Sequence, residues 1–409
     1  MSISKKPKDF QVLFFDMDSF FASVEQQIQP SYRGQPLGVA PYAGNTGCII
    51  AASKEAKKIG IKTGFLVGEA KKVCPQIKVV EARPALYMIY HKEIKKVLSN
   101  LTPFYQPLSV DEFLIKLSPS EQNHKKSLEI GYQIKQKIKS NVGDYLTCSV
   151  GISSNQFLAK MASKYKKPDG LFAIKLQDLK NFYQNLRLRD LTGINFQMEK
   201  RLNLKKIQTP LDLYQKSLYE LVQILGHWGR LWYFRLRGYE IDDFKTKTKN
   251  IGHSHVLAPE LRDYPKAQAV LKKLVAKIGY RLRKNKLLAQ GLSINIKFVN
   301  QAYFKNYKNF APVSDTFALY KYLAEILKKC SWQARPLRLE ATSYNLVPKS
   351  SYQINLFDDF EKQKNLARAL DNINDKYGAE TLGIASAYGA ENSAPDRIPF
   401  GKPRYDIFY

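Results

Sequence analysis

The chain contains 409 residues, of which 44% are hydrophobic, and this length exceeds the usual size of one core, so we expect about two to four domains. Lysine and arginine number 65 against 36 aspartate and glutamate residues, which gives a formal charge of +29. Because this excess is spread along the whole chain, it favours an extended polyanionic partner, with nucleic acid first and an anionic membrane surface second.

The same survey argues against other classes of protein. No stretch approaches the roughly 18 apolar residues of a membrane span, and the first ten residues, MSISKKPKDF, lack the apolar region of a secretory signal. The cysteines form no CxxC pair, which argues against a zinc site or a disulfide framework. We therefore expect a cytoplasmic protein with no membrane partner.

The stretch Val12–Glu25 predicts a buried strand, an acidic turn and a helix. Four apolar residues run directly into Asp16, Met17 and Asp18, and Ser19 is expected to cap the helix. An unpaired buried charge costs several kcal/mol, so carboxylates at such a strand end usually meet a cation, often a hard divalent metal. A solvated strand end beside a helix cap is the alternative. The apolar side of the helix would comprise Phe20, Phe21, Val24 and Ile28.

A second segment predicts a strand over Cys48–Ala52 and a short helix over Ser53–Ile59. This helix presents Lys54, Lys57 and Lys58 near its start. Cationic side chains beside free backbone N–H groups can bind an anion between them, which would suit a triphosphate. A solvated basic face is the alternative.

A helix over Pro84–Leu98 precedes a strand pattern over Phe104–Leu117, which is interrupted by SVDE at residues 109–112. In a straight strand Asp111 and Glu112 would point to opposite faces, so both can serve one metal only where the backbone bends. A hairpin turn is the alternative. One face of the preceding helix would carry Leu86, Ile89, Ile94, Val97 and Leu98.

Helices over Lys125–Ser140 and Ser154–Tyr165 flank a strand over Tyr145–Gly151. Lys160 lies within the second of these helices, and Lys167 follows it. The order of elements to this point is compatible with an antiparallel sheet backed by helices, which is an α+β arrangement.

Residues 171–239 are mainly helical. LTGIN at 191–195, followed by 199–204, resembles a helix-hairpin-helix, whose backbone N–H groups can hold a DNA phosphate, and LGHWG at 225–229 suggests a second such turn. The polar, basic sequence KTKTK at 245–249 predicts an interdomain linker.

Beyond this linker the order becomes β-α-β-β-α-β, the ferredoxin-like topology. Alternate residues Ser293, Asn295 and Lys297 form a polar strand face, which could lie along a duplex groove or in water. The predicted elements are Ile251–Leu257, Lys266–Lys284, Leu292–Val299, Tyr303–Tyr307, Ser314–Lys329 and Leu337–Ser343.

The tail contains a short peptide, QINLF, in which Gln353, Ile354, Leu356 and Phe357 could dock in the pocket of a partner. The alternative is an ordinary hydrophobic connection to the helix predicted over Glu361–Tyr377.

With both acidic motifs in place, the chain resembles the Y-family translesion DNA polymerases, the group of bacterial DNA polymerase IV and the UmuC-type catalytic subunit of polymerase V. The matching motifs are DMDSFFASVE at 16–25, SVDE at 109–112, VGIS with FLAK at 150–160, and KPDG at 167–170. Residues 45–64 look closest to the UmuC branch, and QINLF resembles the sliding-clamp-binding peptide of bacterial polymerases.

The resemblance implies that Asp16, Asp111, Glu112 and the backbone carbonyl of Met17 hold two magnesium ions, with manganese as a substitute, for phosphoryl transfer to a primer. Asp18 matches the motif but is implied to be structural.

The resemblance also implies that Phe21 is the steric gate that selects deoxynucleotides, and that Lys57, Lys167 and Lys54 contact the triphosphate. Lys54 and Lys57 stand where polymerase IV relatives usually carry a tyrosine and an arginine. Positive charge is therefore retained, but the bidentate fork of arginine is lost.

The implied activity is low-fidelity, template-directed synthesis past DNA damage by a monomer, with primer-template DNA, deoxynucleoside triphosphates and a sliding clamp as partners. A catalytically silent DNA- and clamp-binding protein on the same fold is the alternative, and a cyclase-type enzyme acting on free nucleotides is a second one.

The implied right-hand architecture has a ferredoxin-like palm (10–25 and 86–173), small fingers (26–85), a helical thumb (174–240), a basic linker (241–250), a ferredoxin-like little finger (251–347) and a tail (348–409) with the clamp peptide at 353–357.

Overall fold

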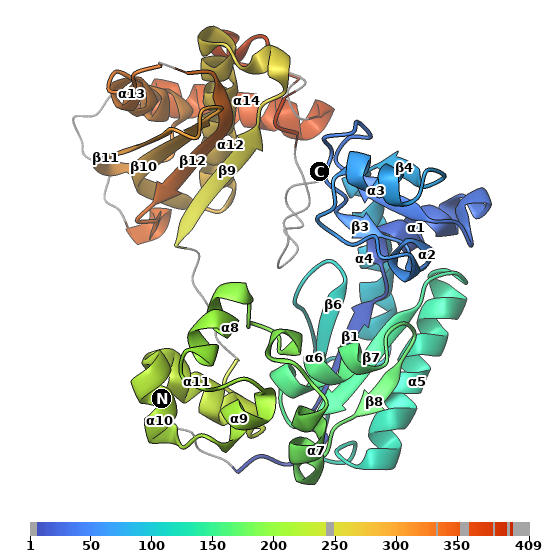
Figure 1. Ribbon diagram of the computed structural model, residues 1–409. Coiled ribbons are helices and arrows are strands. Elements are labelled where there is room, and N and C mark those ends of the chain that lie inside the picture. The colour runs from blue at the N-terminus through green and yellow to red at the C-terminus, as the bar shows by residue number, and fades with distance from the viewer. Residues whose placement is uncertain are drawn as a thin grey trace. The chain divides into compact units, whose positions relative to one another are not determined.

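The protein divides into two compact units, one on either side of residues 243–248 (Figure 1). The computed structural model describes residues 6–242, 249–332, 334–351, 360–378, 381–390 and 393–395. The peptide at 353–357 and most of the predicted linker lie outside these ranges. Within them, no helix is long and apolar enough to cross a bilayer.

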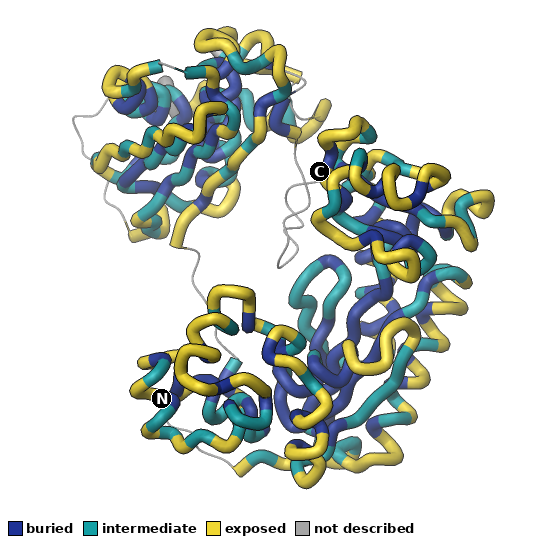
Figure 2. The backbone as a smooth tube through the Cα atoms, viewed as in Figure 1, coloured by how far each residue is buried: buried dark blue, intermediate teal, exposed yellow. Residues whose placement is uncertain are grey.

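The first unit is built around a five-stranded sheet with the order β5-β6-β1-β7-β8. Strand β1 lies antiparallel to β6 and β7, and β8 runs parallel to β7. All six residues of β1 are buried, as the unbroken apolar run predicts for a strand covered on both faces (Figure 2). The strands are β1 (Val12–Met17), β5 (Tyr105–Pro107), β6 (Glu112–Lys116), β7 (Cys148–Ser153) and β8 (Leu171–Ala173).

Helices cover both faces of this sheet. Gly131 of α5 lies against Val150 of β7, whereas the next strand residue, Gly151, packs against Ala159 of α6. Since successive strand residues face opposite sides, α5 and α6 lie on opposite faces. A Cβ at Gly151 would come within 2.0 Å of the Ala159 carbonyl oxygen, so only glycine permits this close approach. The helices are α5 (His124–Asn141) and α6 (Gln156–Tyr165).

Helix α1 (Phe20–Ile28) follows the acidic turn, but the predicted side-chain cap is wrong. Ser19 adopts a left-handed backbone conformation, φ 51°, and its carbonyl oxygen rather than its hydroxyl accepts the N–H of Ser23 at 2.9 Å. A left-handed residue turns its side chain away from the first-turn N–H groups. Of the predicted apolar side, Phe20, Phe21 and Val24 are buried, whereas Ile28 at the helix end is 40% exposed.

Helix α4 (Pro84–Ser99) lies where it was predicted, and Ile94, Val97 and Leu98 of its predicted apolar face are buried. The first turns differ, because Tyr87 and Met88 are buried whereas Ile89 is 56% exposed. Helix α4 contacts both α1 and α5. Tyr87 points toward α1.

A smaller sheet with the order β3-β2-β4 follows α1. The strand predicted over Cys48–Ala52 is only two residues long, because Cys48 pairs with Leu66 in an isolated bridge instead. The hydroxyl of Ser53 accepts the N–H of Ala56 at 3.2 Å and caps the predicted short helix α2. The elements are β2 (Leu37–Ala40), β3 (Ala51–Ala52), α2 (Lys54–Lys58), α3 (Val67–Val73) and β4 (Lys78–Glu81).

The segment predicted to be mainly helical, 171–239, is so from residue 174 onward, whereas residues 171–173 form strand β8 at the edge of the large sheet. Gly193, φ 103°, lies just before α8, and Gly226, φ 60°, joins α10 to α11, so both predicted turns use a left-handed glycine. Tyr183, Leu202 and Trp232 lie in the core of this segment. The helices are α7 (Leu179–Gln184), α8 (Phe196–Asn203), α9 (Pro210–Gln215), α10 (Leu218–Leu225) and α11 (His227–Leu236).

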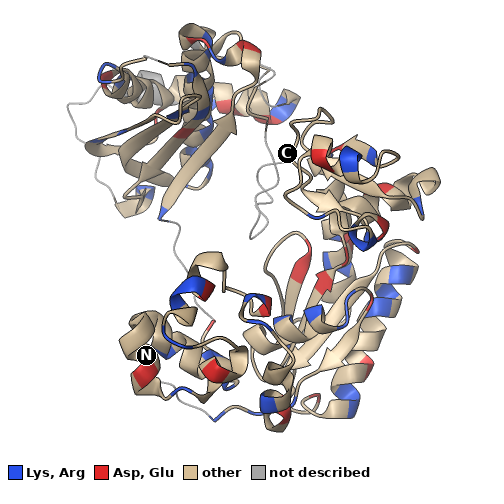
Figure 3. Cartoon of the chain, viewed as in Figure 1, with Lys and Arg blue, Asp and Glu red and all other residues tan. Residues whose placement is uncertain are grey.

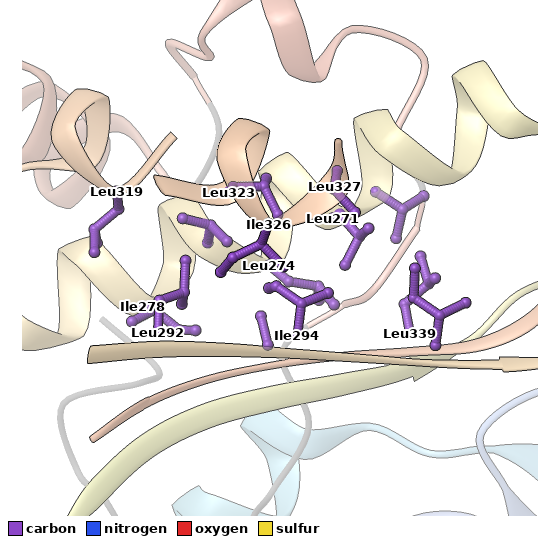
Figure 4. Close-up of a cluster of buried hydrophobic side chains, with 14 of the residues drawn as sticks. Leu271, Leu274, Ile278, Leu292, Ile294, Leu319, Leu323, Ile326, Leu327 and Leu339 are labelled. Atoms are coloured by element: carbon purple, nitrogen blue, oxygen red, sulfur yellow. The ribbon is translucent and has the colours of Figure 1, made fainter. Parts of the chain in front are cut away.

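The second unit confirms the predicted β-α-β-β-α-β order. Its strands lie antiparallel in the order β11-β10-β12-β9, so the ferredoxin-like description applies to the order of elements along the chain. Leu292 and Ile294 point into the core with α12 and α13, whereas Ser293 and Asn295 face the other side (Figure 4). The elements are β9 (Asn250–Val256), α12 (Tyr264–Lys284), β10 (Leu287–Phe298), β11 (Tyr303–Val313), α13 (Thr316–Leu327), β12 (Pro336–Tyr344) and β13 (Val347–Pro348).

A final helix, α14 (Phe360–Tyr377), belongs to this second unit. Arg283 of α12 forms a bidentate ion pair with Asp371 of α14 at 2.6 and 2.7 Å. Planar bidentate pairing fixes orientation as well as contact, so α14 is anchored on α12. Lysine and arginine are distributed over both units (Figure 3).

Candidate active site

Three predicted carboxylates meet at one end of the central sheet. The β1–β6 register places Asp16 directly opposite Glu112, and the N–H of Met17 donates to the carbonyl oxygen of Asp111 at 2.9 Å. Asp111 lies in the turn between β5 and β6, so the hairpin and the acidic cluster are one feature rather than alternatives. The bend at this turn removes the divergence that a straight strand would impose on the two neighbouring acids.

The acidic turn is held in place by polar side chains. The Ser109 hydroxyl donates to Asp111 Oδ1 at 2.5 Å and accepts the N–H of Glu112 at 3.0 Å. Below the turn, the fully buried His91 lies with Nδ1 2.8 Å from the carbonyl oxygen of Val110. These bonds fix the backbone that carries both acids.

Two lysines face the carboxylates. Lys160 of α6 donates to both oxygens of Glu112 at 2.6 and 2.8 Å, and Lys167 lies 2.6 Å from Asp16 Oδ1. Asp16 and Glu112 are thus each paired with a lysine. In the part of the chain that the structure describes, no group of three or more acid, histidine or cysteine side chains is arranged as a metal site.

The electrostatics of the cluster nevertheless suit a divalent cation. Burial, reinforced by the nearby charges of Asp16 and Glu112, raises the pKa of Asp111 to about 6. Burial also raises the pKa of Asp16, although Lys167 acts in the opposite direction. Asp111 and Asp16 are thus less stable as anions than in water, and a divalent cation would relieve this. Their hard oxygen donors fit magnesium.

The cost of keeping Asp111 ionised in this buried site predicts that removing its charge makes the protein more stable. A carboxyl whose folded pKa is raised destabilises the fold above its unfolded pKa, so the penalty grows from pH 3.8 to about 6 and is complete at pH 7.5. We expect Asp111→Asn, measured in chelator, to raise the unfolding free energy by about 1–3 kcal/mol at pH 7.5 and by less at pH 4.5. The exposed Asp178→Asn is the control. An equal change at both pH values would contradict the expectation.

Asp18 lies next to the cluster, but its carboxylate accepts hydrogen bonds from neutral groups instead of facing a lysine. Its carboxylate is 3% exposed and accepts hydrogen bonds from Thr147 Oγ1, Ser149 Oγ and the N–H of Asp169, each at 2.8 Å. These bonds tie the end of β1 to β7 and to the turn that carries Lys167.

The two lysines of α2 that were predicted to contact a triphosphate, Lys54 and Lys57, have different surroundings. Lys57 is exposed, yet the atoms packed around its ammonium group and the nearby Lys167 lower its pKa, while Asp16 and Asp111 act in the opposite direction. Lys57 is therefore within electrostatic reach of the acidic cluster. Lys54 Nζ instead lies 5.8 Å from the centre of the Tyr145 ring.

Phe21 lies in the first turn of α1, directly after the acidic turn. It is 9% exposed, and its ring stacks on that of Tyr87 at 4.4 Å between centroids and 16° between planes. The sequence gives no signal for this partner, because Tyr87 comes from α4. The sequence motif FLAK draws attention to Lys160, but it does not indicate that Lys160 pairs with Glu112.

The large sheet ends in clustered carboxylates that face two lysines. A helical segment and a separate β-α-β-β-α-β unit follow it, and this α+β arrangement is typical of nucleotidyltransferases. Residues 15–164 match the sequence model of the impB/mucB/samB family, and residues 248–356 match the model of the C-terminal domain of that family.

Curated relatives and solved structures agree with this class. DNA polymerase IV of Moorella thermoacetica is 32% identical over 382 residues, covering 91% of this chain and 95% of the relative, and that of Pelotomaculum thermopropionicum is 30% identical, covering 91% and 94%. A Y-family DNA polymerase chimera is similar with a TM-score of 0.70 and 25% identity, covering 82% of this chain and 99% of that one. DinB from Sulfolobus solfataricus has a TM-score of 0.54 and 26% identity, with the same coverage. The chain belongs to the Y family of DNA polymerases.

Proposed function

We propose that the protein is a DNA-directed DNA polymerase of the translesion type, which adds deoxynucleotides to a primer 3′-hydroxyl. The observation that carries this proposal is the meeting of Asp16, Asp111 and Glu112 at adjoining strand ends. Family membership and the excess of basic residues, which suits a DNA partner, support it.

We propose the following roles for the site residues. Asp16, Asp111, Glu112 and the carbonyl of Met17 would hold two magnesium ions, with manganese as a substitute. Such ions, when bound, lower the pKa of the attacking hydroxyl and neutralise the triphosphate. Lys160 balances the charge of Glu112 in the protein itself.

The incoming nucleotide would meet a basic surface beside the cluster. Lys57 and Lys167 supply point charges for the triphosphate, and Phe21 supplies the wall against its sugar. Lys54, which lies over Tyr145, would add charge near the phosphates rather than a direct contact.

We further propose that the elements form the parts of a right-hand polymerase. The large sheet with α4, α5 and α6 would be the palm, the small sheet the fingers, the segment α7–α11 the thumb, and the second unit through β12 the little finger. The small fingers segment would leave the site open to damaged template bases. We expect the enzyme to act as a monomer in the cytoplasm.

Primer extension tests the proposed function. With magnesium and a primer-template duplex, we expect each deoxynucleotide to be added mainly opposite its complementary base. Mismatched additions should occur less often. Turnover of free nucleotides without a primer would instead indicate a cyclase-type enzyme. Binding of DNA without any extension would indicate a catalytically silent DNA-binding protein.

We propose that the peptide Gln353–Phe357, which lies outside the described residues, binds a sliding clamp. Its anchors would be Gln353, Ile354, Leu356 and Phe357. We expect deletion of the peptide to reduce clamp-stimulated extension to about the unstimulated rate, because tethering to a clamp acts through effective concentration. Unstimulated extension should not change.

The control for the clamp prediction is Asn355→Ala, which alters the peptide at a position that carries no anchor. It should keep the stimulation. If the deletion variant responds to the clamp as fully as the intact protein does, the docking peptide lies elsewhere.

A further inference from the structure

Phe21 rests against a second ring. The ring of Tyr87, only 1% exposed, lies nearly parallel to that of Phe21, with 4.4 Å between their centroids. Tyr87 belongs to α4 and Phe21 to α1, so the contact joins two helices that pack together. One side of the Phe21 ring is therefore covered by a side chain from another part of the chain.

Tyr87 is itself held by an ion pair in which the carboxylate is buried and the guanidinium is half exposed. Its hydroxyl donates to Glu25 Oε1 at 2.7 Å, and Arg83 Nε donates to the same oxygen at 3.1 Å while its Nη2 contacts Oε2. Glu25 is almost fully buried. A charge-assisted, bidentate pair of this kind fixes geometry more firmly than a single neutral hydrogen bond.

The spacing of these four residues makes the arrangement rigid. Phe21 and Glu25 are four residues apart on α1, and Arg83 and Tyr87 are four residues apart at the start of α4, so each pair shares one helix face. The two faces meet, so that Phe21 stacks on Tyr87 and Glu25 pairs with Arg83. A movement of Tyr87 away from Phe21 would break the hydrogen bond to Glu25.

A steric gate excludes a 2′-hydroxyl only if its ring cannot retreat. A small displacement of an unsupported ring would admit one extra oxygen atom, whereas a ring backed by close-packed neighbours can move only by distorting them. We propose that Tyr87, held by Glu25 and Arg83, is a specificity-determining positioning residue that braces Phe21 and thereby sets the preference for deoxyribose over ribose. This inference rests on the proposed polymerase function and on Phe21 as the wall against the sugar.

The test is the ratio of kcat/KM for a deoxynucleotide to that for its ribonucleotide, opposite one template base with magnesium. Because both values come from one preparation, the ratio does not depend on the fraction of folded enzyme. We expect Tyr87→Leu, which removes the flat backing and the hydroxyl, to lower the ratio about tenfold or more. Tyr87→Phe keeps the ring and loses only the bond to Glu25, so we expect a smaller decrease of a few-fold.

Two further variants make the test specific. Tyr183 is also a fully buried tyrosine, and its hydroxyl donates to the carbonyl oxygen of Leu236 at 2.8 Å, far along the chain from Phe21. Tyr183→Leu should leave the ratio unchanged. In a Phe21→Ala background, Tyr87→Leu should cause no further decrease, because the ring that it braces is absent.

The outcomes separate the brace from the gate. If Phe21→Ala lowers the ratio and Tyr87→Leu does not, the brace is overturned and the gate stands. A fall of equal size in Tyr183→Leu would also overturn the brace, since the effect would then not depend on the contact with Phe21. If neither Phe21→Ala nor Tyr87→Leu changes the ratio while extension continues, both assignments fail but the polymerase function stands. Should Tyr87→Leu not fold, a wild-type ratio in Tyr87→Phe contradicts the proposal by itself.

Discussion

Replacing Asp111 and Glu112 together by alanine should lower the rate of primer extension at least about a thousandfold. The two substitutions leave Asp16 as the only carboxylate of the cluster, too few oxygen ligands for the proposed magnesium ions. Charge stabilisation by bound metal amounts to several kcal/mol, and each 1.36 kcal/mol corresponds to a factor of ten in rate. DNA affinity should persist, because the change removes negative charge beside a polyanion.

The measurement is single-turnover addition of one nucleotide to a labelled primer, with DNA binding measured on the same preparation. Asp178→Ala, which removes an exposed carboxylate outside the cluster, should extend at the wild-type rate. The single variant Asp111→Asn should be more stable than wild type in chelator and yet severely impaired in extension. If the double variant kept more than about a tenth of the wild-type rate, the metal-ligand assignment would be lost.

Replacing Phe21 by alanine should raise ribonucleotide incorporation, relative to deoxynucleotide incorporation, by about a hundredfold. Phe21 is only 9% exposed, so we expect its truncation to open space where a 2′-hydroxyl is otherwise excluded. Loss of stacking on Tyr87 should also reduce stability by about 3–5 kcal/mol, the usual cost of truncating a core phenylalanine.

The ratio of kcat/KM for the two sugars measures this effect independently of the loss of stability. Phe182→Ala is the matched control, because Phe182 of α7 is comparably buried, at 7% exposed, and its ring packs against Tyr165, Phe172 and Tyr183 rather than against Phe21. It should lower stability comparably while keeping the wild-type preference. An unchanged preference in Phe21→Ala would mean that another side chain faces the sugar.

Much of the central sheet could be predicted because its local patterns are strong. An apolar run ending in acids indicated β1, and SVDE within a strand pattern indicated the turn before β6. The sequence alone could not show that Asp16 and Glu112 lie side by side, since they become neighbours only through the β1–β6 register. Register depends on pairing between distant segments and not on either segment alone.

The lysines illustrate the same limit at the level of side chains. Lys160 and Lys167 lie close together in sequence, yet one faces Glu112 and the other Asp16. The direction taken by Lys54 depends on Tyr145, a residue from a different part of the first unit. Long, flexible side chains follow their nearest partners, and those partners come from tertiary structure.

Two local predictions failed where tertiary packing prevailed. Ser19 had the right residue type for a cap, but it adopts a left-handed conformation after the acidic turn. Ile89 fitted the helical periodicity, but the first turns of α4 bury Tyr87 and Met88 and leave Ile89 exposed. The buried position of Tyr87 is also what brings its ring against Phe21.

The second unit could be predicted more fully. Long, periodic segments such as those of α12 and β10 specify element type strongly, and their order was confirmed. The spatial order β11-β10-β12-β9 could not be deduced from it, because more than one antiparallel arrangement is compatible with β-α-β-β-α-β.

Extension across a single abasic site tests the central claim most directly, because it requires both template-directed nucleotidyl transfer and tolerance of damage. With magnesium and all four deoxynucleotides, we expect the wild-type protein to produce primers that continue past the lesion. The Asp111→Ala, Glu112→Ala variant should give none. Wild-type products that stop one nucleotide before the lesion, on a template whose undamaged counterpart is copied fully, would contradict the account.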